Sequence, residues 1–101
     1  MTVIKEGPLI RLMGTVRERW STKVVLIPTH LANERLKTVL LHFSEQLKEK
    51  FWEFFDDDLT PKRSIILIVN GVDYVAFGGL DARIAPETEI TILSALHGGK
   101  S

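Results

Sequence analysis

Residues 64–77 of the 101-residue chain read SIILIVNGVDYVAF, and this stretch decides the fold. The run SIILIV over residues 64–69 is apolar on both pleat faces, which predicts a central strand with cover on each side. Asn70-Gly71 is the strongest hairpin signal in the chain, because both residues tolerate positive φ. Residues 72–77 are then expected to form a short return strand.

Further strands are expected on either side of this stretch. Residues 9–16 (LIRLMGTV) and residues 23–27 (KVVLI) have strand patterns, and the short polar turn between them favours an antiparallel hairpin. Residues 89–96 form the last predicted strand, because its apolar side chains alternate. One face of that strand is expected to carry Ile90 and Ile92, and the other Thr91, Leu93 and Ala95.

One long amphipathic helix is predicted in the middle of the chain. Its apolar side chains recur every three or four residues, namely Leu36, Leu40, Phe43, Leu47 and Phe51. Thr29 or Asn33 is expected to cap its start. An unbroken helix over residues 31–55 would be about 37 Å long, which is too long for so small a domain. A break is therefore expected at residues 48–50, with the aromatic side chains beyond it folding back as a cluster.

This order of elements predicts an α+β protein in which a mixed sheet of four or five strands packs on one main helix. The arrangement is the β-grasp, or ubiquitin-like, fold. Residues 1–96 are expected to form this single domain, and residues 97–101 a flexible C-terminal tail. A monomer is expected, because one domain of this size can bury a core of its own.

Composition excludes several classes of function. The chain has 13 Lys and Arg against 13 Asp and Glu, so neither nucleic acid nor an anionic membrane is expected as a partner. It shows no signal peptide and no run near the roughly 20 apolar residues that span a bilayer, which predicts a cytoplasmic protein. The absence of Cys excludes disulfides, iron–sulfur clusters and a cysteine nucleophile.

No active site or metal site is expected from the side chains. The three histidines, His30, His42 and His97, lack the short spacing of metal-ligand motifs. The acidic run over residues 56–58 lacks the spaced oxygens of a calcium loop, and a solvated loop explains it.

The chain closes with LHGGKS, residues 96–101, in which two glycines follow the last strand. Because glycine has no Cβ atom, two consecutive glycines form a thin segment of backbone that can enter a narrow channel. Together with Asn70-Gly71, Asp73-Tyr74 and residues 79–81 (GLD), this ending resembles the ubiquitin-like sulfur carriers, the family of the molybdopterin-synthase small subunit and the thiazole carrier (MoaD/ThiS-like). Its Leu-His-Gly-Gly is most similar to the ubiquitin-related modifier of tRNA thiolation. Residues 15–18 (TVRE) also resemble the Arg-Glu that follows the first strand of molybdopterin-synthase carriers.

The resemblance implies a carrier and not an enzyme. A ubiquitin-activating-type adenylating enzyme would use ATP to adenylate the Gly99 carboxylate, with Gly98 beside it, while the chain itself binds no cofactor. Sulfur would then give a thiocarboxylate for a sulfur-accepting synthase or thiolase, in molybdopterin, thiazole or tRNA thiolation. In some members the glycine joins a lysine instead. Partner contacts are expected on the sheet face away from the helix and in the tail, at Leu93, Ala95, Leu96 and His97.

Lys100-Ser101 depart from the family pattern, because carriers that act directly end at the second glycine. The chain is a precursor trimmed by a protease, or it has lost the carrier role, or the two residues are foreign to the natural protein. We favour the precursor, in which Lys100 and Ser101 are removed. The alternative function is a ubiquitin-like protein-interaction domain without tail chemistry, and for Leu93 the alternative is ordinary packing under a loop.

Overall fold

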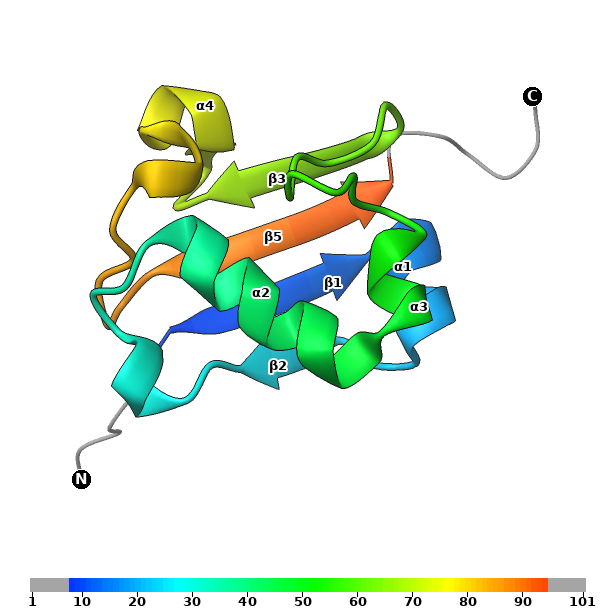
Figure 1. Cartoon of the computed structure of the whole chain (residues 1–101), viewed down its shortest axis with the longest axis horizontal. Helices are drawn as coiled ribbons and strands as arrows, with labels where there is room; N and C mark the ends of the chain where they lie inside the picture. Colours follow the sequence, from blue (N-terminus) through cyan, green and yellow to red (C-terminus); the bar gives the residue numbers. More distant parts are fainter. Residues whose placement is uncertain (1–7, 95–101) are drawn as a thin grey trace.

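The computed structural model describes residues 8–94 of the chain. Figure 1 shows a twisted sheet with its main helix lying across one face. In chain order the elements are β1 (Leu9–Met13), α1 (Gly14–Trp20), β2 (Val24–Leu26), the 3-10 helix η1 (Thr29–Leu31), α2 (Leu36–Leu47), α3 (Glu49–Trp52), β3 (Ile65–Val69), β4 (Val72–Asp73), α4 (Tyr74–Phe77), the 3-10 helix η2 (Gly79–Asp81) and β5 (Glu89–Ser94).

The sheet has five strands in the order β2-β1-β5-β3-β4. β1 and β5 run parallel, whereas β1–β2, β3–β5 and β3–β4 are antiparallel pairs. The first and last strands of the described chain are therefore neighbours at the centre of a mixed sheet. This arrangement confirms the predicted β-grasp fold and the predicted hairpin of the first two strands.

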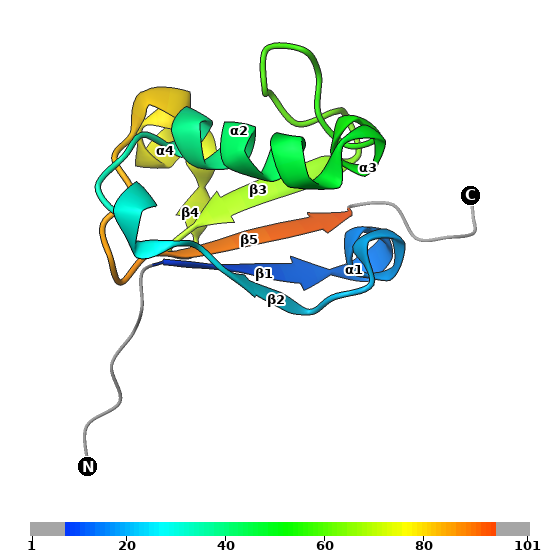
Figure 2. The ribbon, with the colours of Figure 1, turned by 60° about the horizontal axis from the view of Figure 1, so that its bottom comes forward.

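The core lies between the sheet and the helix layer that contains α2 and α3 (Figure 2). We call the sheet face that packs on α2 the inner face, and the opposite one the outer face. Side chains of the inner face are almost fully buried: Ile10, Leu12, Leu67, Ile90 and Ile92. Ile66 and Ile68 alternate with them on β3 and are only half-buried, so the prediction of cover on both faces of this strand is wrong.

The predicted break in the long helix is confirmed at Lys48. This residue lies between α2 and α3 with φ 53° and ψ −123°, a conformation that L-residues other than glycine rarely adopt. The turn brings the following aromatic rings back onto the core, where Phe51 stacks on Phe55 with centroids 4.5 Å apart. Trp52 meets Phe51 edge-on at 4.9 Å, so the expected aromatic cluster forms.

The predicted cap of the main helix is wrong. Thr29 opens η1 and Asn33 has φ 70°, while α2 begins after Arg35 without a side-chain cap. Instead, the Leu36 backbone N–H donates to the carbonyl of Ala82, at 2.8 Å. The loop before β5 thus satisfies one of the first-turn amides that have no partner within the helix.

Two predicted strands are too long. Residues 14–16, together with residues 17–20 of the polar turn expected between the first two strands, form α1 instead, because Gly14 has φ +66° and ends the extended backbone. The return strand stops at Asp73, whose carboxylate accepts a hydrogen bond from the Val75 N–H at 2.9 Å. That contact starts α4.

The predicted loop over residues 56–58 and the predicted turn at Asn70-Gly71 are confirmed. The side chains of residues 56–58 are exposed in a loop. Asn70 and Gly71 adopt φ 51° and 84° in the hairpin turn, as expected. Within residues 8–94, no helix is long and apolar enough to cross a membrane.

Candidate functional site

The strand β5 leads into the C-terminal tail, so its last residues define the candidate site. The register places Leu93 beside Met13 of β1 and beside Ile66 of β3. Because these three alternate with the buried Leu12 and Ile92 along their strands, they lie on the outer face. Met13 is 46% exposed, and the other two are half-buried. We call Met13, Leu93 and Ile66 the tail-end row.

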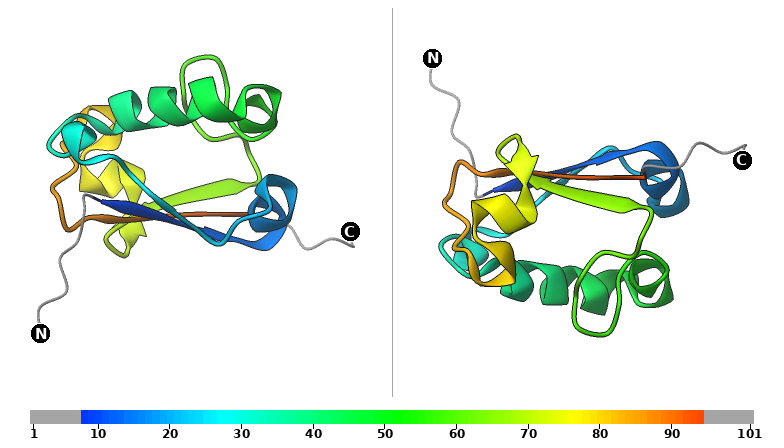
Figure 3. Two further views of the ribbon diagram at one scale, coloured as in Figure 1. Left: turned by 90° about the horizontal axis from the view of Figure 1, so that it is seen from below. Right: turned by 90° about the horizontal axis from the view of Figure 1, so that it is seen from above.

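The rest of the outer face continues this apolar surface toward the sheet edge. Val24 and Leu26 of β2 are exposed by 40% and 60%. Further from the tail, Arg11 and Glu89 form an ion pair with Nε and Oε2 2.6 Å apart. In the part of the chain that the structure describes, α2, α3 and α4 all lie on the other side of the sheet (Figure 3).

The helix α1 lies directly against the end of β5. A Cβ atom at Gly14 would come within 3.6 Å of the backbone nitrogen of Ser94. Val16 and Trp20 anchor α1 in the core. The Trp20 Nε1–H donates to the Lys50 carbonyl at 3.1 Å, and the ring stacks on Phe51 with centroids 6.3 Å apart. The end of β5 therefore lies against a helix that is fixed from two sides.

A second tie joins α1 to the segment after α3. Arg19 Nε donates to Glu53 Oε1 at 3.0 Å, and its Nη2 donates to the other carboxylate oxygen. These hydrogen bonds hold the pKa of the Glu53 carboxyl below its usual value. The pair is exposed, so it orients α1 more than it stabilises the fold.

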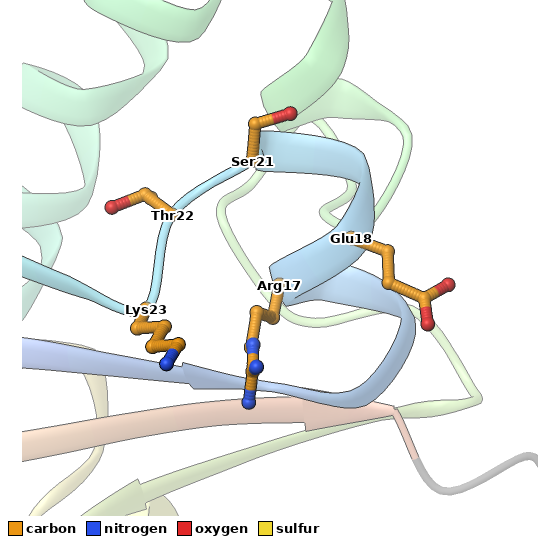
Figure 4. A pocket seen from close by; sticks show the side chains of 5 residues that line it. All are labelled: Arg17, Glu18, Ser21, Thr22 and Lys23. Carbon is orange, nitrogen blue, oxygen red and sulfur yellow. The ribbon is translucent and has the colours of Figure 1, made fainter.

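A shallow hollow opens beside α1, lined by Arg17, Glu18, Ser21, Thr22 and Lys23. Figure 4 shows the side chains of Arg17 and Lys23 both extending toward β1, whereas Glu18 points away from them. Arg17 and Glu18 belong to the TVRE motif singled out in the sequence, and the structure places them on α1. Two positively charged side chains thus lie on the side of the hollow that faces β1 (Figure 4).

Among the predicted site residues, only Leu93 is described by the structure, and it lies on the outer face as expected. The other predicted positions fall outside residues 8–94: Ala95, Leu96, His97, Gly98, Gly99, Lys100 and Ser101. Their roles stay predictions.

Sequence reasoning missed most of the outer face. Met13 and Ile66 were not singled out, although their alternation with Leu12 and Leu67 places them on the same face as Leu93. The sequence also contains a signal for the helix α1, because the apolar residues Val16 and Trp20 are spaced by one helical turn. Within residues 8–94, no group of three or more His, Asp or Glu could hold a metal ion.

A β-grasp sheet, an apolar row at the end of its last strand and a helix fixed beside it define a ubiquitin-like protein. The fold is shared with solved structures. The solution structure of Urm1 from Trypanosoma brucei superposes with a TM-score of 0.73 at 16% identity, covering 97% of this chain and 100% of that one. The small archaeal modifier protein 1 of Methanosarcina acetivorans gives 0.73 at 21% identity, covering 96% and 100%.

Sequence comparison identifies the family. Residues 12–99 match Urm1 (Ubiquitin related modifier). The chain is also 31% identical over 64 residues to the ubiquitin-related modifier 1 homolog of Dictyostelium discoideum, a match covering 63% of this chain and 67% of that protein. The chain therefore belongs to the ubiquitin-related modifier family, whose members are carriers rather than enzymes. Membership implies an adenylating partner of the ubiquitin-activating type.

Proposed function

We propose that the chain carries activated sulfur, or modifies other proteins, through the carboxylate of Gly99 after Lys100-Ser101 have been removed. The observation that supports this most strongly is the extent of the family match, which runs from residue 12 to residue 99. The matched region therefore includes the second glycine and excludes the last two residues. Family membership favours tRNA thiolation as the sulfur-accepting process.

The carbon of a free carboxylate is a poor electrophile, so the proposed chemistry begins by activating it. The Gly99 carboxylate attacks the α-phosphorus of ATP, pyrophosphate leaves, and an acyl-adenylate forms. A sulfur nucleophile at the oxidation level of hydrosulfide then attacks the acyl carbon, AMP leaves, and a thiocarboxylate remains. In conjugation, a lysine amine takes the place of the sulfur and forms an amide. The partner enzymes supply the catalytic side chains, and this chain supplies the reacting carboxylate.

The tail-end row supports a docking role in these steps. An apolar surface at the C-terminal end of β5 lets an adenylating enzyme bind the sheet while the two glycines enter its active site. The contacts of α1 with β5, Lys50 and Glu53 hold this helix against the end of β5. Arg17 and Lys23 add a positive rim, which suits an acidic border on the partner.

The absence of cysteine allows a direct test. Full-length protein and residues 1–99 are incubated with ATP, a sulfur donor and an extract of the host, and then treated with a thiol-alkylating reagent. Intact mass spectrometry reads the product. Because no side chain of the chain offers a thiol, an alkylated adduct reports a terminal thiocarboxylate.

We expect the adduct on residues 1–99. An adduct on protein that began full length, with Lys100-Ser101 lost, would also show that the extract trims the tail. The matched control is residues 1–99 carrying Gly99→Ala, which should give no adduct at unchanged thermal stability. If neither form reacts while a known carrier does so in parallel, the interaction-domain alternative is correct.

A further inference from the structure

We propose that His30 and His42 form a two-imidazole site for a divalent transition-metal ion such as Cu²⁺, Zn²⁺ or Ni²⁺. His30 belongs to η1 and His42 to α2, so the fold brings together two histidines that the sequence separates. Their ring centroids lie 6.3 Å apart, with an angle of 80° between the ring planes. The site is independent of the tail and of the proposed carrier function.

The backbones that carry the two rings are fixed by neighbouring core residues. Leu31, next to His30, is 7% exposed, and Phe43, next to His42, is 4% exposed. In η1 the Leu31 N–H donates to the Pro28 carbonyl at 2.9 Å. The His30 side chain is exposed and His42 is half-buried, so ligand exchange with water is open while the backbone positions stay in place.

The ring separation suits one shared ion. A metal–nitrogen bond of about 2.0–2.1 Å places the ring centre about 3.2 Å from the metal. Two rings on one ion then have centroids about 4.5 Å apart at a nitrogen–metal–nitrogen angle of 90°, about 5.2 Å at the tetrahedral angle and about 6.4 Å when the two nitrogens are trans. The observed 6.3 Å is close to the trans value. A tetrahedral ion would require rotation of the exposed His30 side chain to bring the rings about 1 Å closer.

Gln46 contacts one ring nitrogen of His42. Its Nε2 lies 3.2 Å from Nε2 of His42. When the amide donates, this ring nitrogen carries no proton and presents the lone pair that a metal needs. Gln46 is exposed, so its amide moves aside on metal binding and water completes the coordination. Imidazole ligands suit Cu²⁺, Zn²⁺ and Ni²⁺, with Cu²⁺ the tightest.

The test uses the full chain, whose only imidazoles are His30, His42 and His97. Zn²⁺ chloride is titrated into isotope-labelled protein, and the imidazole carbon–proton signals are followed by NMR. We expect His30 and His42 to shift together and saturate at one equivalent, with the His97 signal unchanged. Isothermal titration with Cu²⁺, Zn²⁺ and Ni²⁺ gives the affinities.

Three variants decide the assignment. His30→Ala and His42→Ala should each weaken Zn²⁺ binding about a hundredfold, because the second ligand no longer binds intramolecularly. His97→Ala is the matched control and should bind like the unaltered chain. The proposal is wrong if His97→Ala alone removes binding, if either single variant retains the full affinity, or if the two signals saturate at different metal concentrations. Circular dichroism confirms that each variant is folded.

Discussion

The two faces of the sheet are built from the same strands but differ in what covers them. On the inner face Ile10, Leu12 and Ile92 are at most 2% exposed, because α2 and the aromatic rings after it pack there. On the outer face Met13 and Leu26 are equally apolar but 46% and 60% exposed. Apolar side chains left exposed together on one face are typical of surfaces that bind a partner.

The largest difference between the faces should appear in stability. Leu67→Ala removes a fully buried side chain of the inner face and should lower the free energy of unfolding by about 2–5 kcal/mol. Ile66→Ala, one position along on the outer face, should cost about 1 kcal/mol, because its side chain already meets water. Urea unfolding midpoints at unchanged slope measure both. Equal losses would mean that the outer face is part of the core.

The next largest effect concerns docking. Met13→Lys places a charge in the tail-end row and should slow adenylation of residues 1–99 about tenfold, which is the loss of a moderate interface contact. Val75→Lys is the matched control, because Val75 is 65% exposed and lies on α4, at the other end of the sheet from the tail (Figure 1). Both variants should unfold at nearly the temperature of the unaltered protein. A similar adenylation rate for the two would remove the tail-end row from the interface.

A smaller effect is expected in the helix layer that covers the inner face. Lys48→Gly should raise the free energy of unfolding by about 1 kcal/mol, because glycine adopts φ 53° and ψ −123° without strain. Lys50→Gly, within α3, should lower it by about 0.5–1 kcal/mol. Thermal unfolding of the pair compares them directly. A loss of stability in both variants would show that the break is not strained.

The smallest effect is the pH dependence of the tie between α1 and Glu53. Arg19 lowers the folded-state pKa of Glu53 below its ordinary 4.5, so its stabilising contribution is complete above that value and is lost as the pH falls through the folded-state pKa. Glu53→Gln should therefore make the melting temperature fall less between pH 6 and pH 3. Asp57→Asn, in the exposed acidic loop, serves as the control. If the melting temperature of Glu53→Gln falls between pH 6 and pH 3 as much as that of the unaltered protein, the ion pair contributes nothing to stability.

The central elements of the fold could be predicted from local patterns. The Asn70-Gly71 turn signal specifies where β3 ends. The alternation of Ile90 and Ile92 with polar residues specifies β5 as a strand. The break at Lys48 followed from length alone. The α1 and α4 helices were missed, because Gly14 and Asp73 decide them through backbone conformation and a single capping contact.

The site was only partly predictable for a different reason. Leu93 could be placed on the outer face from alternation, but its neighbours Met13 and Ile66 come from strands far away in the sequence. The register between strands depends on tertiary packing, so it cannot be inferred from a local sequence pattern. The same holds for His30 of η1 and His42 of α2, whose ring centroids lie 6.3 Å apart in the fold.

The most direct test of the account is ATP–pyrophosphate exchange by a purified adenylating enzyme of a ubiquitin-related modifier system, with residues 1–99 as substrate. Exchange should require the unaltered Gly99, fall about tenfold with Leu93→Lys and stay unchanged with Val75→Lys. This outcome would link the reacting glycine to the outer face of the sheet. Full exchange with Gly99→Ala or with Leu93→Lys would contradict it.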